Sequence, residues 1–222
     1  MNVELINIDC MEYMAGLDDN VFDLAIVDPP YGIGIAKSGR IGTGNKFKPS
    51  NWDNKVPDLS YFDELRRVSK SQIVWGANYF DGVGLIGGAI VWNKLGTHIG
   101  RRKVCPTFSE CEIAHYSNSN NVKMFSYTYI GNVQGNDYQI LWDQTDKIHP
   151  TQKPVNLYDW LLQNYAKPEM RILDTHLGSG SSAIAAHYFG CDFVGCEIDR
   201  DYFEAAQKRF DKETRQIDFK FE

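Results

Sequence analysis

The run Asp28-Pro29-Pro30-Tyr31 carries the clearest chemistry in this sequence, and it follows the hydrophobic segment 23–27. Its two prolines fix the backbone and remove two N–H donors, so the run cannot continue a strand and presents acceptors and a ring. A carboxylate and a proline carbonyl can accept the two hydrogens of an exocyclic amine while a tyrosine stacks on its plane. An adenine swung out of a duplex is such a group. The same residues also fit a strand that ends in a surface turn.

A second run with binding chemistry extends from Asp174 to Gly180. Residues 171–174 predict a strand, and a glycine turn then leads into a helix that begins with small residues. Such glycines let a ligand approach the backbone, and a helix N-terminus offers unpaired N–H groups. Glu197 ends the next predicted strand, where a carboxylate can accept both hydroxyls of a ribose. This arrangement predicts a nucleotide-type site.

More than one ligand fits this glycine turn. Residues 178–183 match the dinucleotide fingerprint G-x-G-x-x-A, which is typical of dehydrogenases. A nucleoside sulfonium needs the glycines and the ribose acid but no pyrophosphate contacts, and nothing upstream resembles a hydride-transfer site. A structural turn with a solvent-facing Glu197 is the third interpretation. A further segment, His149-Pro150-Thr151-Gln152-Lys153-Pro154, is by itself the entry of a helix.

Seven short runs rich in branched or aromatic residues predict strands, with amphipathic helices between several of them. The strands are expected at 3–8, 23–27, 72–76, 88–93, 111–116, 171–174 and 193–197, and the helices at 58–70, 154–166, 180–189 and 200–213. This order predicts an α/β fold with a seven-stranded, mostly parallel sheet and helices on both faces. Ligands bind at the carboxyl ends of such strands, where the acids Asp9, Asp28, Asp174 and Glu197 stand.

Length and composition predict one domain over residues 1–222, with irregular stretches at 32–57 and 117–148. The sequence has no apolar run near the roughly 20 residues that span a bilayer, so we expect a cytoplasmic protein without a membrane partner. The five cysteines form no C-x-x-C pair, which argues against a zinc site and a disulfide framework, and we expect no metal.

The net charge of −6 is unusual for a nucleic-acid binder, but two segments are locally basic. Residues 37–48 and 94–103 contain lysines and arginines without an acid. Each segment is either an ordinary solvated loop or a phosphate-binding patch beside the pocket.

Together, the runs at 28–31, 149–154 and 174–180 resemble the β class of amino-group DNA methyltransferases, in which the catalytic motif precedes the cofactor motif. Residues 72–79 and 90–94 also look like strands of that family. The resemblance implies a Rossmann-like methyltransferase fold with permuted motif order. One departure is Asp174-Thr175-His176, where the family usually has Asp-Pro-Phe. We expect His176 to fill the packing position of the aromatic residue rather than to act in catalysis.

The resemblance implies transfer of a methyl group from S-adenosylmethionine to adenine N6 of a flipped base, as in restriction-modification systems. The catalytic residues would be Asp28, Pro29, Pro30 and Tyr31. The cofactor would lie across Gly178 and Gly180, with Glu197 on its ribose, Asp9 near its adenine and the 149–154 segment at its methionine end. The full set of expected cofactor contacts is Asp9, Asp28, His149, Thr151, Lys153, Asp174, His176, Gly178, Ser179, Gly180, Glu197 and Ile198.

Double-stranded DNA is the implied partner. Residues 32–57 would form a flexible catalytic loop that closes over the base, and 117–148 a small target-recognition insert. This insert is short for reading several base pairs, so we expect a second subunit of a homodimer or the basic loop at 98–103 to contribute to recognition. DNA contacts are expected from Lys37, Arg40, Lys46, Lys48, Arg101, Arg102, Lys103 and Lys123, of which Lys46, Lys48, Arg101 and Arg102 would meet phosphates. Base contacts are expected from Lys123, Tyr127, Tyr129 and Gln134, which also fit surface positions of an irregular hairpin.

Other functions fit parts of the same pattern. Cytosine-N4 transfer is one, although Asp at the first motif position favours adenine within the family. Transfer to RNA or to a glutamine side chain would use an Asn-Pro-Pro-Tyr run, which Asp28 disfavours. A catalytically silent DNA-binding subunit is a further alternative, and the intact Asp28, Gly178, Gly180 and Glu197 argue against it.

Overall fold

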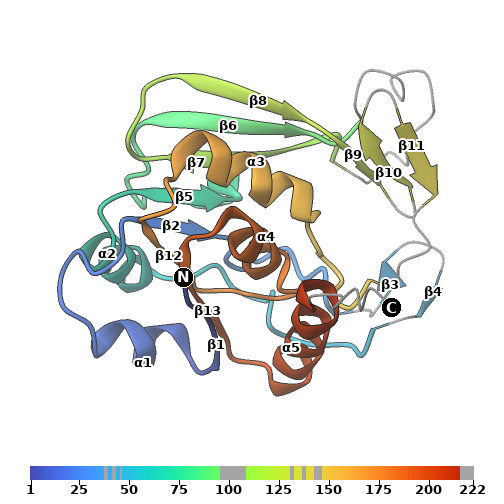
Figure 1. Ribbon diagram of the computed structural model, residues 1–222, viewed down its shortest axis with the longest axis horizontal. Helices are drawn as coiled ribbons and strands as arrows, with labels where there is room; N and C mark the ends of the chain where they lie inside the picture. The colour runs from blue at the N-terminus through green and yellow to red at the C-terminus, as the bar shows by residue number, and fades with distance from the viewer. Residues whose placement is uncertain are drawn as a thin grey trace, which may run out of the picture.

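The computed structural model describes residues 1–37, 40–41, 44–45, 47–95, 109–130, 133–136, 139–142 and 147–215. An eight-stranded sheet forms its centre (Figure 1). The strand order is β1 (Val3–Asn7), β13 (Asp192–Glu197), β12 (Arg171–Asp174), β2 (Leu24–Val27), β5 (Gln72–Trp75), β7 (Cys111–Tyr116), β6 (Gly88–Asn93) and β8 (Val122–Ser126). Neighbouring strands are parallel except that β7 runs antiparallel to β5 and β6. The expected mostly parallel sheet is therefore confirmed.

The sheet has one strand more than the seven expected. The added strand, β8, lies at the edge and pairs parallel with β6. Its side chains Val122 and Met124 are exposed, and it follows an asparagine-rich stretch, so its sequence lacks the buried apolar run by which the other strands are recognised.

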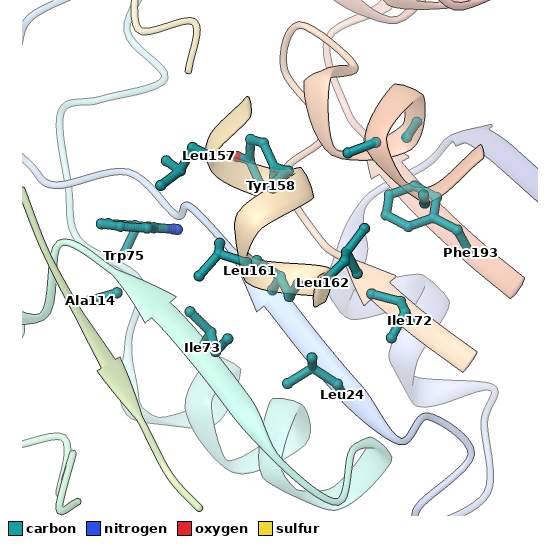
Figure 2. Packing of buried hydrophobic residues seen from close by; sticks show 14 of the residues in the cluster. Leu24, Ile73, Trp75, Ala114, Leu157, Tyr158, Leu161, Leu162, Ile172 and Phe193 are labelled. Carbon is teal, nitrogen blue, oxygen red and sulfur yellow. The ribbon is translucent and has the colours of Figure 1, made fainter. Parts of the chain in front are cut away.

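Helices cover both faces of the sheet, as the sequence predicted. The helices α1 (Cys10–Ala15) and α2 (Leu59–Val68) pack on one face through Met14, Phe62 and Leu65. The helices α3 (Val155–Tyr165), α4 (Ser181–Phe189) and α5 (Arg200–Thr214) belong to the other face. Figure 2 shows Leu157, Leu161 and Leu162 of α3 above the strand residues Leu24, Ile73 and Ile172. Alternating strand residues thus feed two separate apolar layers.

The segments expected to be irregular contain short strands of their own. A hairpin joins β3 (Arg40–Ile41) to β4 (Gly44–Asn45), and a three-stranded antiparallel sheet contains β9 (Thr128–Ile130), β10 (Val133–Asn136) and β11 (Gln139–Trp142). Both lie on the side of the molecule to which the arrows of β5, β6 and β8 point (Figure 1). The short helix η1 (Ala77–Tyr79) follows β5. The flexibility of 32–57 and the recognition role of 117–148 stay predictions.

None of the helices in the described part of the chain is both long and apolar enough to cross a membrane. The same residues contain no group of histidine, cysteine and acidic side chains that could hold a metal ion.

Candidate active site

Asp28 stands directly after β2, at the carboxyl edge of the sheet, and contacts two other groups. The Tyr31 hydroxyl donates to Asp28 Oδ1 at 2.5 Å, and Lys153 Nζ donates to Asp28 Oδ2 at 2.5 Å. The two motifs at 28–31 and 149–154 therefore meet at one carboxylate. Burial raises the pKa of Asp28 above its usual value, although the Lys153 ammonium acts in the opposite direction.

Glu112, near the start of β7, extends this cluster. Lys153 Nζ lies 3.1 Å from Glu112 Oε2, and Lys94 Nζ lies 3.1 Å from Glu112 Oε1. Burial would raise the pKa of Glu112, but the ammonium groups of Lys153 and Lys94 lower it below its usual value. Glu112 was not predicted as a site residue, because nothing in the residues around it marks an acid in a predicted strand as part of a site.

The Tyr31 ring stacks on Tyr79, with 4.9 Å between centroids and an angle of 14° between planes. Gly76, at φ +75°, makes room for this ring, since a Cβ there would overlap Tyr31. The Tyr31 ring therefore already has one stacking partner, Tyr79, within the protein.

Asp53, which was not predicted as a site residue either, holds the segment after the proline run. Its Oδ1 accepts from the backbone N–H groups of Tyr31 at 2.8 Å and Gly32 at 2.9 Å, and its Oδ2 accepts from Ile35 N–H at 3.0 Å. Asp53 is only 2% exposed. One carboxylate therefore fixes the direction in which the chain leaves the proline run.

Two cavities open at this edge. The first, of about 550 Å³, lies beside the proline run, and residues on its wall include Asp28, Tyr31, Tyr79, Lys94 and Glu112. The second, of about 370 Å³, lies beside the glycine turn, and its wall includes Asp9, Gly178, Ser179, Glu197 and Ile198. The residues common to both walls are Asp28, Pro30, Trp52, Thr151, Gln152 and Lys153. The carboxylate of Asp28 thus stands where the cavities adjoin.

The glycine turn is built around Glu197, which is 9% exposed. Glu197 Oε2 accepts from Gly178 N–H and Oε1 from Asp199 N–H, both at 2.9 Å. Gly178 and Gly180 have φ of +53° and +73°, which is the left-handed region that glycine adopts without strain. Burial raises the pKa of Glu197. Asp9 also lines the second cavity, and its Oδ1 caps α1 by accepting from Met11 N–H at 2.7 Å.

Two of the residues expected to contact a cofactor lie behind the turn. Asp174 is 1% exposed, accepts from Ser182 Oγ at 2.6 Å and His176 N–H at 3.0 Å, and is not on the wall of either cavity. Its burial raises its pKa to about 7. Gly180 faces Ala206 of α5. Both residues support the turn from behind.

The two histidines on the wall of the second cavity are held by aromatic contacts. His149 lies edge-on to Tyr202, with 4.4 Å between ring centroids, and 5.3 Å from Trp52. His176 lies edge-on to Tyr61 at 5.4 Å, in agreement with the expected packing position. Burial lowers the pKa of His149 to about 3 and of His176 to about 4, so both rings are neutral at physiological pH.

The expected DNA contacts are spread over the molecule. Lys37 is exposed, and Lys48 forms an exposed ion pair with Asp201 at 2.9 Å. Lys123 pairs in register with Ile90 near the start of β8, away from the carboxyl edge that carries Asp28. Arg40 starts β3. The remaining expected contacts, Lys46, Arg101, Arg102 and Lys103, lie outside the described residues.

The alternative that Tyr129 is a surface residue of an irregular hairpin is wrong, while its contact with a DNA base stays a prediction. Tyr129 is 7% exposed, packs 6.3 Å from Trp92 and accepts a hydrogen bond from Gln152 Nε2 at 3.4 Å. It is instead part of the wall of the first cavity. Its burial depends on partners from other segments, Trp92 and Gln152, which the local sequence does not reveal.

The fold is that of the Rossmann-like methyltransferases. The crystal structure of the M1.HpyAVI complex with S-adenosylmethionine superposes with a TM-score of 0.58 at 20% identity, covering 94% of this chain and 100% of that one. The cytosine-N4-specific PvuII DNA methyltransferase superposes with a TM-score of 0.61 at 12% identity, covering 96% and 86%.

The sequence also identifies the family. The DNA methylase family N6_N4_Mtase matches residues 74–208, more than half of the chain, and the protein belongs to this family. The type II methyltransferase M2.MboI of Moraxella bovis is 24% identical over 243 residues, covering 93% of this chain and 86% of the relative. The expected methyltransferase class is thereby confirmed.

Proposed function

We propose that this protein transfers a methyl group from S-adenosylmethionine to the N6 amine of adenine in double-stranded DNA. The observation that carries this proposal is the position of Asp28 on the common wall of the two cavities. A base amine in the first cavity and a methyl donor in the second would both lie beside this carboxylate.

The second cavity suits the methyl donor. Carboxylates of Asp9 and Glu197 on its wall can accept from hydroxyl and amine groups, and the glycine at 178 lets a ligand approach the backbone. Trp52, His149 and Tyr202 supply apolar ring surface. Bound S-adenosylmethionine would supply a methyl group activated by the adjacent sulfonium.

In the first cavity, the chain must orient a weakly nucleophilic amine. The lone pair of the amine is delocalised into the ring, and acceptors for its hydrogens at Asp28 and the Pro29 carbonyl direct that lone pair toward the methyl carbon. The nitrogen–carbon bond forms as the carbon–sulfur bond breaks, and the electron pair of that bond stays on sulfur. The nitrogen then releases one proton, for which the Asp28 carboxylate is an acceptor.

The choice of adenine rests on Asp28 at the first motif position. The fold does not separate the two amino-group reactions, because the PvuII enzyme has the same fold and is cytosine-N4-specific. Cytosine N4 is therefore the second candidate. The homodimer, the basic loops as phosphate contacts and the recognition role of 117–148 stay predictions.

Incubation of the purified protein with unmethylated DNA and S-adenosylmethionine, followed by digestion to nucleosides and mass spectrometry, tests the proposal. We expect N6-methyladenine. Detection of N4-methylcytosine would change the assigned base from adenine to cytosine. Absence of both methylated nucleosides would overturn the proposed reaction.

The variant Asp28→Asn tests the residue assignment. It should lower methyl transfer strongly, because a neutral amide keeps only one acceptor oxygen and cannot take up the released proton, while cofactor binding by calorimetry should persist. Asp63→Asn, which changes an exposed acid of α2 paired with Arg66, is the matched control.

A further inference from the structure

The charged side chains beside Asp28 form a largely buried row of alternating sign. The order is Lys94, Glu112, Lys153 and Asp28, with nitrogen–oxygen distances of 3.1, 3.1 and 2.5 Å. The side-chain exposures are 15% for Lys94, 23% for Glu112, 4% for Lys153 and 15% for Asp28. The row therefore carries no net charge when all four groups are ionised.

Lys153 is the most deeply buried of these groups. A buried ammonium costs several kcal/mol in desolvation unless close anions compensate it. Burial alone would lower the pKa of Lys153, but the carboxylates of Asp28 and Glu112 raise it above its usual value. Lys153 is thus a permanent cation in contact with the carboxylate that the proposed reaction uses.

One carboxylate would suffice to neutralise Lys153, yet the fold supplies two. Lys153 bound to Asp28 alone would withdraw negative charge from the oxygen that must accept the amine hydrogen. Glu112 shares the ammonium with Asp28, and Lys94 in turn balances Glu112. The Lys153 ammonium thus offsets part of the burial that raises the pKa of Asp28, without committing the charge of Asp28 to a single partner.

Building on the proposed function, we propose that Lys153 and Glu112 are positioning residues that set the charge of the catalytic Asp28 in opposite directions. Lys153 stabilises the anion of Asp28, and Glu112 weakens that stabilisation. Neither residue needs to touch the methyl group or the amine.

The electrostatic surroundings of Asp28 include groups from several elements. Tyr31 and Lys153 bond to it directly, and the groups coupled to it through space are Glu112 of β7, Tyr61 of α2, Tyr158 of α3 and Asp174 of β12. Lys153 and Glu112 are the two whose removal changes the fixed charge in opposite senses.

The test is the pH profile of single-turnover methyl transfer, at saturating DNA and cofactor, for Lys153→Met and Glu112→Gln. Loss of Lys153 should raise the pKa of Asp28 and move the acid limb of the profile to higher pH. Loss of the Glu112 charge should lower that pKa and move the limb to lower pH. A displacement of about one pH unit corresponds to about a tenfold change in rate on the acid limb.

The controls separate this inference from folding and from the proposed function. Glu204→Gln removes an exposed acid of α5 and should leave the profile in place. In the double variant Lys153→Met with Glu112→Gln, the acid limb should lie at lower pH than in Lys153→Met, because Glu112 no longer repels the Asp28 anion. If Lys153→Met does not fold, the downward displacement in Glu112→Gln still decides.

Acid limbs that stay at the wild-type position, or that move in the same direction in both variants, would overturn the inference while leaving methyl transfer intact. A wild-type protein that transfers no methyl group would instead overturn the proposed function.

Discussion

The Tyr31 ring occupies the space that a side chain at Gly76 would need. Gly76 therefore leaves the room that an aromatic ring of the proposed base pocket needs.

Gly76→Ala should displace Tyr31 and reduce methyl transfer. The substitution also introduces backbone strain of about 1–3 kcal/mol, because φ at residue 76 is +75°. Gly82→Ala is the matched control, since Gly82 has φ +73° and open space around it. Urea unfolding should show a similar backbone strain in both variants. The rate of methyl transfer should fall more in Gly76→Ala than in Gly82→Ala. Equal rates in the two variants would show that the position of Tyr31 does not matter.

Asp53→Asn should loosen the segment after the proline run. An amide retains one acceptor oxygen, but its NH₂ group would face a backbone N–H that now donates to a carboxylate oxygen. We expect methyl transfer to fall by about ten- to a hundredfold, as small misplacements of reacting groups do. Limited proteolysis within 31–57 should accelerate, and cofactor affinity should change little. Asp63→Asn is the control, and unchanged proteolysis in Asp53→Asn would contradict this account.

Acidification should destabilise the protein through His149. Its pKa is about 3 in the folded chain and about 6.5 when unfolded, so between these values the unfolded state binds more protons. This contribution to stability is complete above pH 6.5 and is lost as the pH falls toward 3. From pH 6.5 to 5 the loss approaches about 2 kcal/mol.

His149→Phe keeps an aromatic ring beside Tyr202 and removes the titration. Its free energy of unfolding in urea should depend less on pH over this range than that of the wild type. His187→Phe, on α4, is the control and should keep the wild-type dependence. A wild-type pH dependence in His149→Phe would refute the assignment.

Lys48→Ala should weaken DNA binding at low salt. Lys48 and its partner Asp201 are 89% and 74% exposed, so the ion pair is easily exchanged for a phosphate contact. Loss of one such contact should reduce the slope of log K against log salt by about 1. Titrations at several salt concentrations measure it. Lys70→Ala is the control, because Lys70 precedes β5 at the opposite edge of the sheet, and equal slopes in both variants would exclude Lys48 as a phosphate contact.

Local sequence patterns predicted the elements and the edge at which the proposed site lies. The seven expected strands exist because each is a short apolar run between turn residues, and Asp28 and Glu197 follow from where such runs end. Asp53 could not be predicted from such patterns, because the glycine-rich segment around it has no periodicity. The partners of Asp53 are backbone groups at residues 31–35. Glu112 depends on pairing between distant strands, which one sequence does not reveal.

The reversed direction of β7 has a consequence for how this protein family can diversify. Because β7 runs against β5 and β6, its first residues rather than its last lie at the edge that carries Asp28. Glu112 pairs in register with Trp92 of β6, and residues further along β7 pair with β5, so the position of Glu112 does not depend on the connections that lead in and out. Surrounding loops can therefore change in length and composition while the acid keeps its place.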